Sequence, residues 1–230
     1  MMKPIHLPPF DAVLFDFDGT LSAHNLDFAD MHRQVLALTL TQGLPRDEIQ
    51  HLYILELIDY ATAWLKQRDT DLSATYYRQV HQLLEDIEVA SALENAFIPG
   101  VEELLALLRE HAIAIGIVTR NCNAAVRAMF PDLDVYCQVF LARDHVPQVK
   151  PHPSHLQAAL DLLGCTPART LMIGDGALDM QAGKHLNMFS IGVLTGTSTR
   201  ESLIEHGADL VFDTVVDLRH YLPNAIAEPD

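Results

Sequence analysis

The sequence predicts an α/β protein in which a doubly wound parallel sheet is interrupted by an all-helical insertion. Three observations support this fold class. A four-residue apolar run at residues 12–15 is bounded by a glycine turn, which is typical of a buried strand. Residues 23–95 carry only helical periodicity. From residue 96 onward, short apolar runs alternate with amphipathic segments, the pattern of a parallel sheet with helices on both faces.

The segment after the first strand is expected to form three or four helices. Apolar residues recur there every three or four positions, so each group lies along one face of a helix. The groups are Phe28, Met31, Val35 and Leu38; Leu52, Leu55, Ile58, Ala61 and Leu65; and Tyr76, Val80, Leu83 and Ile87. Leu44-Pro45 and the polar residues 66–71 separate them. We therefore expect a helical cap domain over residues 23–95.

The rest of the chain, residues 1–22 and 96–230, should form a Rossmann-like core. The expected strands are residues 12–15, 112–118, 139–142, 170–173, 189–193 and 210–212. The expected helices are residues 101–110, 123–130, 153–163, 179–186 and 199–205. Because strand and helix alternate with short connections, the strands are expected to run parallel. A chain of 230 residues with 49% hydrophobic content can bury both this core and the cap.

The composition argues against several kinds of partner. Asp and Glu total 31 against 15 Lys and Arg, and the formal charge of −16 disfavours nucleic acid and anionic membranes. No stretch of about eighteen residues is free of charge, so no membrane-spanning helix is expected. Cys122, Cys137 and Cys165 form no C-x-x-C pair, and the first residues lack a signal peptide's apolar segment. We expect a cytoplasmic monomer or homodimer.

Chemically active side chains follow several of the predicted strands. In an open parallel sheet, ligands bind beyond the carboxyl ends of the strands, so these residues should meet at one edge. They are Asp16, Asp18 and Gly19 after the first strand; Thr119, Arg120 and Asn121 after the second; Lys150, a short loop beyond the third; and Asp175 and then Asp179 after the fourth. Two ionised carboxylates at the end of one buried strand repel each other unless a cation offsets them.

This set suits Mg²⁺-dependent phosphoryl transfer. Mg²⁺ prefers oxygen ligands, and Asp16 and Asp175 are the best side-chain candidates. A carboxylate beside the metal can attack phosphorus to form an aspartyl-phosphate, and a second acid such as Asp18 can protonate the leaving oxygen. Thr119 and Lys150 would hold the phosphoryl oxygens and neutralise their charge. The expected substrate is a small phosphorylated metabolite.

Taken together, these motifs resemble those of the haloacid dehalogenase superfamily of phosphatases. Residues 16–21, Asp-Phe-Asp-Gly-Thr-Leu, match its first motif and Thr119 matches its second. Lys150-Pro151 matches the third, and residues 174–179 match the fourth. The resemblance spans roughly residues 11 to 217, with the motifs in the right order.

The resemblance implies a role for each motif residue. Asp16 would be the nucleophile, and Asp18 the general acid and base, with its backbone carbonyl on Mg²⁺. Asp175 would be a further metal ligand, and Asp179 would support the metal's waters or Lys150. Gly19, Thr119, Arg120, Asn121 and Lys150 would form the phosphate and substrate site.

The helices between the first and second motifs resemble the cap of the phosphoglycolate phosphatase-like branch. The tail, residues 192–213, is also similar to that branch, whose members dephosphorylate small phosphorylated acids, sugars or nucleotides. Residues 22–25, Ser-Ala-His-Asn, and the pair Arg120-Asn121 differ from the residues usual there. Both segments are expected on the substrate side.

Several alternatives remain at this stage. A phosphomutase would share the same core residues, and a non-catalytic phosphate sensor would share the fold, whereas a dehalogenase has no use for an acid at position 18.

Thr119 and Asn121 could also cap the following helix, and Arg120 could pair with a substrate carboxylate or with the acidic cap. His152 and His155 have helical spacing but lack a third zinc ligand, and His24 lies where the cap should meet the site.

Overall fold

The computed structural model describes residues 7–23 and 26–222 of the chain. Its central element is a six-stranded sheet in the order β3-β2-β1-β4-β5-β6, in which every neighbouring pair is parallel. The strands are β1 (Ala12–Phe15), β2 (Ala114–Val118), β3 (Val139–Leu141), β4 (Thr170–Gly174), β5 (Phe189–Val193) and β6 (Leu210–Phe212). The predicted doubly wound α/β fold is therefore confirmed. Among the described residues, no helix is both long enough and apolar enough to cross a bilayer.

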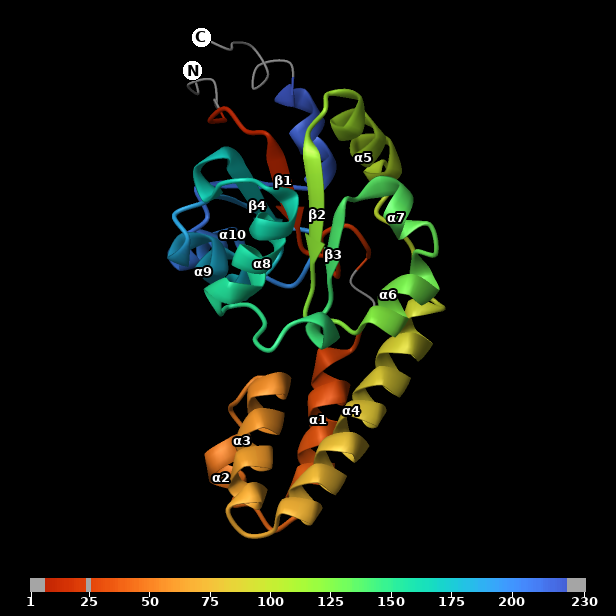
Figure 1. Cartoon of the computed structure of the whole chain (residues 1–230), viewed down its shortest axis with the longest axis vertical. Helices are drawn as coiled ribbons and strands as arrows, with labels where there is room; N and C mark the ends of the chain where they lie inside the picture. Colours follow the sequence, from red (N-terminus) through yellow and green to blue (C-terminus); the bar gives the residue numbers. More distant parts are fainter. Residues whose placement is uncertain (1–6, 24–25, 223–230) are drawn as a thin grey trace. The chain divides into compact units, whose positions relative to one another are not determined.

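Helices cover both faces of this sheet (Figure 1). One face packs against α5 (Val101–Glu110), α6 (Asn123–Met129) and α7 (Leu133–Tyr136), and the other against α8 (Pro153–Leu163), α9 (Ala177–His185) and α10 (Arg200–His206). Alternate residues of β1 point to opposite faces of the sheet. Val13 and Phe15 pack in the apolar cluster on the α5 side, and Leu14 packs in the cluster on the α8 side. This alternation explains why β1 is apolar at every position.

The sequence placed most boundaries of the core elements within two residues. One element was missed: α7, a single turn of Leu133–Tyr136, which is too short to show a helical period. The strand expected from residue 112 begins at Ala114, because Ala112 has a φ of 57° and therefore lies in a turn. Short 3₁₀ turns occupy Arg143–His145, Pro167–Arg169 and Val215–His220.

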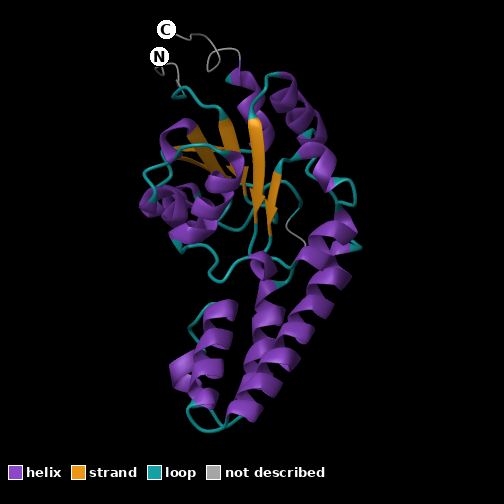
Figure 2. Cartoon of the chain, viewed as in Figure 1, coloured by secondary structure: helices purple, strands orange, loops and turns teal. Residues whose placement is uncertain are grey.

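A second compact unit spans Asn25–Glu94, and residues 1–24 and 95–230 make up the first. Within its described residues, the second unit contains α1 (Phe28–Leu40), α2 (Arg46–Ile49), α3 (Ile54–Lys66) and α4 (Thr70–Ala92) and no strand (Figure 2). The helices pack around their own apolar cluster. At its centre the buried Tyr76 hydroxyl lies 2.7 Å from Oγ1 of Thr39, which satisfies both polar groups. The expected cap covers residues 23–95.

The chain segment that precedes this helical unit is paired with the segment that follows it. The backbone N–H of Ala23 donates to the carbonyl of Ala96 at 2.9 Å, and that of Ile98 donates to Leu21 at 3.0 Å. Ser22 and Phe97 form an antiparallel bridge between these two hydrogen bonds. The two ends of the insertion are thus paired with each other within the core.

Candidate active site

The register of the sheet brings three predicted motifs to one edge. Phe15, the last residue of β1, is paired with Ile117 of β2 and with Ile173 of β4. Asp16 follows Phe15 directly, whereas Thr119 and Asp175 lie two residues beyond their paired positions. Because the strands are parallel, the loops that follow them start side by side.

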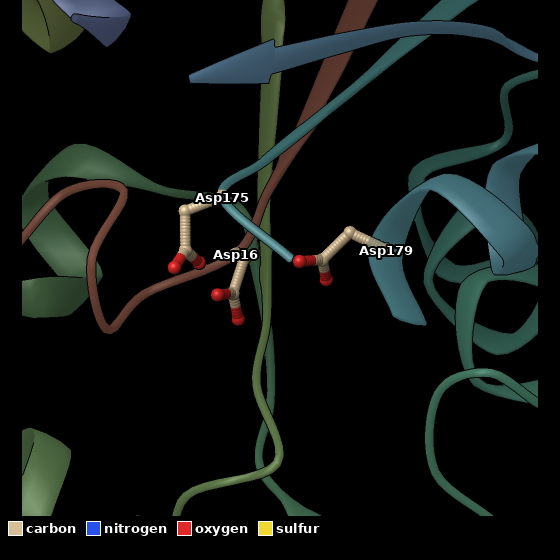
Figure 3. Close-up of side chains that lie close together, drawn as sticks. All are labelled: Asp16, Asp175 and Asp179. Carbon is tan, nitrogen blue, oxygen red and sulfur yellow. The ribbon is translucent and has the colours of Figure 1, made fainter. Parts of the chain in front are cut away.

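Three carboxylates meet at this edge: those of Asp16, Asp175 and Asp179 (Figure 3). One oxygen of each lies within 4.8 Å of the others, and the side chains of Asp175 and Asp179 are buried. Burial, followed by the charges of Asp16 and Asp179, raises the pKa of Asp175 well above its usual value. Close, buried carboxylates of this kind are stabilised by a cation, and an all-oxygen donor set suits Mg²⁺. The residues present therefore fit the expected metal.

Lys150 supplies a positive charge within this cluster. Its Nζ donates to Oδ1 of Asp16 at 2.7 Å and to Oδ1 of Asp179 at 2.6 Å, and its side chain is only 1% exposed. Burial alone would lower the pKa of Lys150, but the two carboxylates outweigh it and raise the pKa. Lys150 is therefore charged at neutral pH.

Asp179 is held from two sides in the first turn of α9. Its Oδ2 accepts from the backbone N–H of Gly176 at 3.1 Å, while its Oδ1 faces Lys150. Burial raises the pKa of Asp179 to about 6, although the Lys150 charge opposes the shift. Asp179 thus contacts Lys150, and the role implied by the resemblance, support of Lys150 or of the metal's waters, stays a prediction.

Asp18 and Asn121 are in contact although 103 residues separate them. The amide Nδ2 of Asn121 donates to Oδ2 of Asp18 at 3.0 Å. The backbone N–H of Asn121 in turn donates to the Thr119 hydroxyl at 3.0 Å. The loop after β2 therefore orients the carboxylate of Asp18, a link that the sequence did not reveal. The cap residue of the following helix is Cys122, not Thr119 or Asn121.

Arg120 has a partner that the sequence did not suggest. One of its guanidinium nitrogens donates to the backbone carbonyl of Lys150. Arg120 thus connects the loop after β2 to the loop that carries Lys150. Its expected contact with the substrate stays a prediction.

The two histidines with helical spacing, His152 and His155, are both engaged in hydrogen bonds. His152 is exposed and caps α8 through Ser154. His155 is fully buried, and both ring nitrogens are engaged: Nδ1 lies 3.2 Å from the backbone N of Lys150, and Nε2 lies 3.2 Å from the carbonyl of Leu141. No ring nitrogen of His155 is left for zinc. His24, also considered, lies outside the described residues.

The loop after β5 contributes to the site and was missed by the sequence analysis. The Thr195 hydroxyl donates to the carbonyl of Gly19 at 2.5 Å. Gly196 lies so close to Asp175 that a Cβ atom there would collide with Oδ2 of the carboxylate. The available signal was the position of Gly196, a small residue just beyond a strand's carboxyl end.

A sequence model of the haloacid dehalogenase-like hydrolases matches residues 13–193. The chain belongs to this family. A phosphoglycolate phosphatase from Salmonella paratyphi A is 29% identical over 230 residues, covering 90% of each chain. The pyrophosphatase PpaX from Bacillus mycoides is also 29% identical, over 210 residues, covering 90% of this chain and 94% of that protein. The resemblance to the phosphatases of this family is thus confirmed.

The fold is also found among solved structures. A hydrolase from Pseudomonas syringae superposes with a TM-score of 0.65 at 23% identity, covering 93% of this chain and 98% of that one. The fold of the present chain is thus shared with a solved hydrolase along most of its length.

Proposed function

We propose that this protein is a Mg²⁺-dependent phosphomonoester hydrolase that works through a phospho-Asp16 intermediate. The observation that supports this most strongly is the position of Asp16 at the end of β1. Its carboxylate bonds to Lys150 and lies in one cluster with Asp175. A nucleophilic carboxylate beside fixed cationic and metal-binding groups is the arrangement that phosphoryl transfer needs.

The chain's own residues would divide the reaction as follows. A carboxylate oxygen of Asp16 attacks phosphorus and displaces the alcohol, whose oxygen takes a proton from Asp18. Asp18 then removes a proton from a water molecule, which attacks the phospho-Asp16 and releases inorganic phosphate. Thr119 and Lys150 hold the phosphoryl oxygens throughout. Mg²⁺, bound by Asp16, Asp175 and the backbone carbonyl of Asp18, would supply positive charge to the transferring phosphoryl group.

The relatives suggest which small phosphate compounds to test. Those described above are named for phosphoglycolate and pyrophosphate hydrolysis, so both compounds belong in a substrate panel with phosphorylated sugars and nucleotides. Analysis of the products with a phosphorylated sugar separates hydrolysis from a mutase reaction.

We further propose that the protein is cytoplasmic and a monomer or homodimer.

The nucleophile is tested by Asp16→Asn. An amide is a far weaker nucleophile, so Mg²⁺-dependent hydrolysis of p-nitrophenyl phosphate should fall by more than about 1,000-fold. The matched control is Asp161→Asn, the same change at an exposed position of α8. It should keep wild-type activity. Turnover retained by Asp16→Asn would exclude Asp16 as the nucleophile.

A further inference from the structure

His155 is the one fully buried histidine among the described residues, and the proposed reaction does not use it. It lies in the first turn of α8, five residues after Lys150. Its Nδ1 accepts a hydrogen bond from the backbone N–H of Lys150 at 3.2 Å. The backbone carbonyl of Lys150 accepts from Arg120. Both polar backbone groups of this lysine are therefore held by side chains, which fixes the starting point of its side chain.

The other ring nitrogen of His155 reaches the end of a neighbouring strand. Nε2 lies 3.2 Å from the carbonyl oxygen of Leu141, the last residue of β3. The same oxygen accepts the backbone N–H of Thr119 at 3.0 Å. His155 and Thr119 thus share one acceptor, so the imidazole ring connects the Lys150 loop to the strand ends that carry Thr119.

These two hydrogen bonds require one form of the ring. Nδ1 accepts and must be unprotonated, whereas Nε2 donates to a carbonyl and must carry the proton. Burial, and then the charge of Lys150, lowers the pKa of His155 to about 3. The ring is therefore neutral at neutral pH, and it keeps its acceptor on the Lys150 side.

We propose that His155 is a positioning residue. It fixes Lys150 between Asp16 and Asp179, and it fixes the position of Lys150 relative to Thr119. The role rests on the proposed phosphatase function, because it acts through Lys150. Since the Lys150 ammonium faces two carboxylates at 2.6–2.7 Å, a small displacement of its backbone weakens both contacts. A misplacement of about 1 Å at such a site can cost roughly 100-fold in rate.

Two substitutions separate the contributions of the hydrogen bonds at Nδ1 and at Nε2. In His155→Asn, the side-chain oxygen can take the place of Nδ1 and keep the bond from Lys150, while the bond to Leu141 is lost. In His155→Gln, the longer amide can reach Leu141, while the acceptor for Lys150 is lost. The control is His152→Gln, which changes an exposed histidine of the same segment.

We expect His155→Gln to lower kcat for p-nitrophenyl phosphate by about 10- to 100-fold with little change in KM. The loss falls on kcat because Lys150 supports charge that develops in the transition state. His155→Asn should stay within about threefold of wild type, although each variant loses one buried hydrogen bond and should lose similar thermal stability. Equal kcat in the two variants at equal folded fraction would overturn the proposal.

A second measurement is independent of activity. Long-range ¹H–¹⁵N spectra of the labelled protein report the tautomer of each histidine, and the His155 signals are identified by their loss in His155→Asn. They should show a neutral ring protonated on Nε2 between about pH 5 and pH 8. A ring protonated on Nδ1 would overturn the proposal. A wild-type protein inactive on every ester would instead reject the proposed function, and the spectra would still test the bond to Lys150.

Discussion

Gly196 allows the loop after β5 to lie close against Asp175. Its φ is not in the left-handed region, so the requirement for glycine is steric: a Cβ atom would collide with the Asp175 carboxylate. In Gly196→Ala, we expect Asp175 to move. The Mg²⁺ concentration for half-maximal activity should then rise by about tenfold or more, as for other groups that orient metal ligands.

The neighbouring exposed residue provides the control for this change. Thr197→Ala alters the same loop without filling the space beside Asp175, and it should leave the Mg²⁺ requirement unchanged. An unchanged requirement in Gly196→Ala would show that Asp175 does not depend on this close approach.

At the level of single residues, the sequence predicted where the acidic side chains lie better than it predicted which residues hydrogen-bond to them. Asp16 and Asp175 could be placed because each follows an apolar strand, and parallel strands end at a common edge. The contact of Asn121 with Asp18 joins residues 103 positions apart, and no local pattern encodes it. The helical period can place His155 on the inner face of α8, but it cannot show which backbone groups lie there.

Among the secondary structure elements, α9 carries Asp179 and packs tightly on the sheet through Gly183. A Cβ atom at Gly183 would collide with Oγ of the buried Ser190 in β5. We expect Gly183→Ala to push α9 outward and to lower the free energy of unfolding by roughly 1–3 kcal/mol. Urea denaturation measures this loss, and kcat should fall with it because Asp179 moves.

The matched double variant tests the cause. Ser190 Oγ has no hydrogen-bond partner among the described residues, so Ser190→Ala alone should change stability by less than about 1 kcal/mol. Combined with Gly183→Ala, it removes the colliding atom and should restore most of the lost stability. Additive losses in the double variant would contradict this account.

The order of the elements was predictable for a physical reason. Short apolar strands and amphipathic helices differ in period, so their alternation identified the sheet. In the helical unit, the four-residue α2 and the junctions between helices were not resolved, because each covers about one turn. The single-turn α7 was missed for the same reason.

For the whole molecule, the carboxylate cluster should link stability to pH and Mg²⁺. Without metal, the folded protein raises the pKa of Asp175, and that of Asp179 from 3.8 to about 6. A carboxyl group whose pKa is raised in the folded state lowers the free energy of unfolding as pH rises through that folded-state pKa. Below the pKa of the unfolded chain this loss disappears. Mg²⁺ offsets these charges, so it should stabilise the protein more at about pH 7.5 than at about pH 5.

Thermal unfolding with Mg²⁺ and with a chelator measures this difference at each pH. We expect Mg²⁺ to raise Tm by about 3 °C or more at the higher pH and by less at the lower one. The comparison within one pH removes the contribution of His155, whose lowered pKa destabilises the folded state below pH 6.5 under both conditions. A larger Mg²⁺ effect at the lower pH would contradict the expected linkage.

The paired residues that flank the helical unit have a consequence for how this enzyme can diversify. Because Ser22 and Phe97 lie against each other, the chain exits and re-enters the core across a gap of one strand spacing. A segment inserted there need not stretch or compress the loop of Asp16 and Asp18, whatever its length. With such a junction, the inserted helices can be exchanged or lengthened during evolution while the loop that carries Asp16 and Asp18 keeps its conformation.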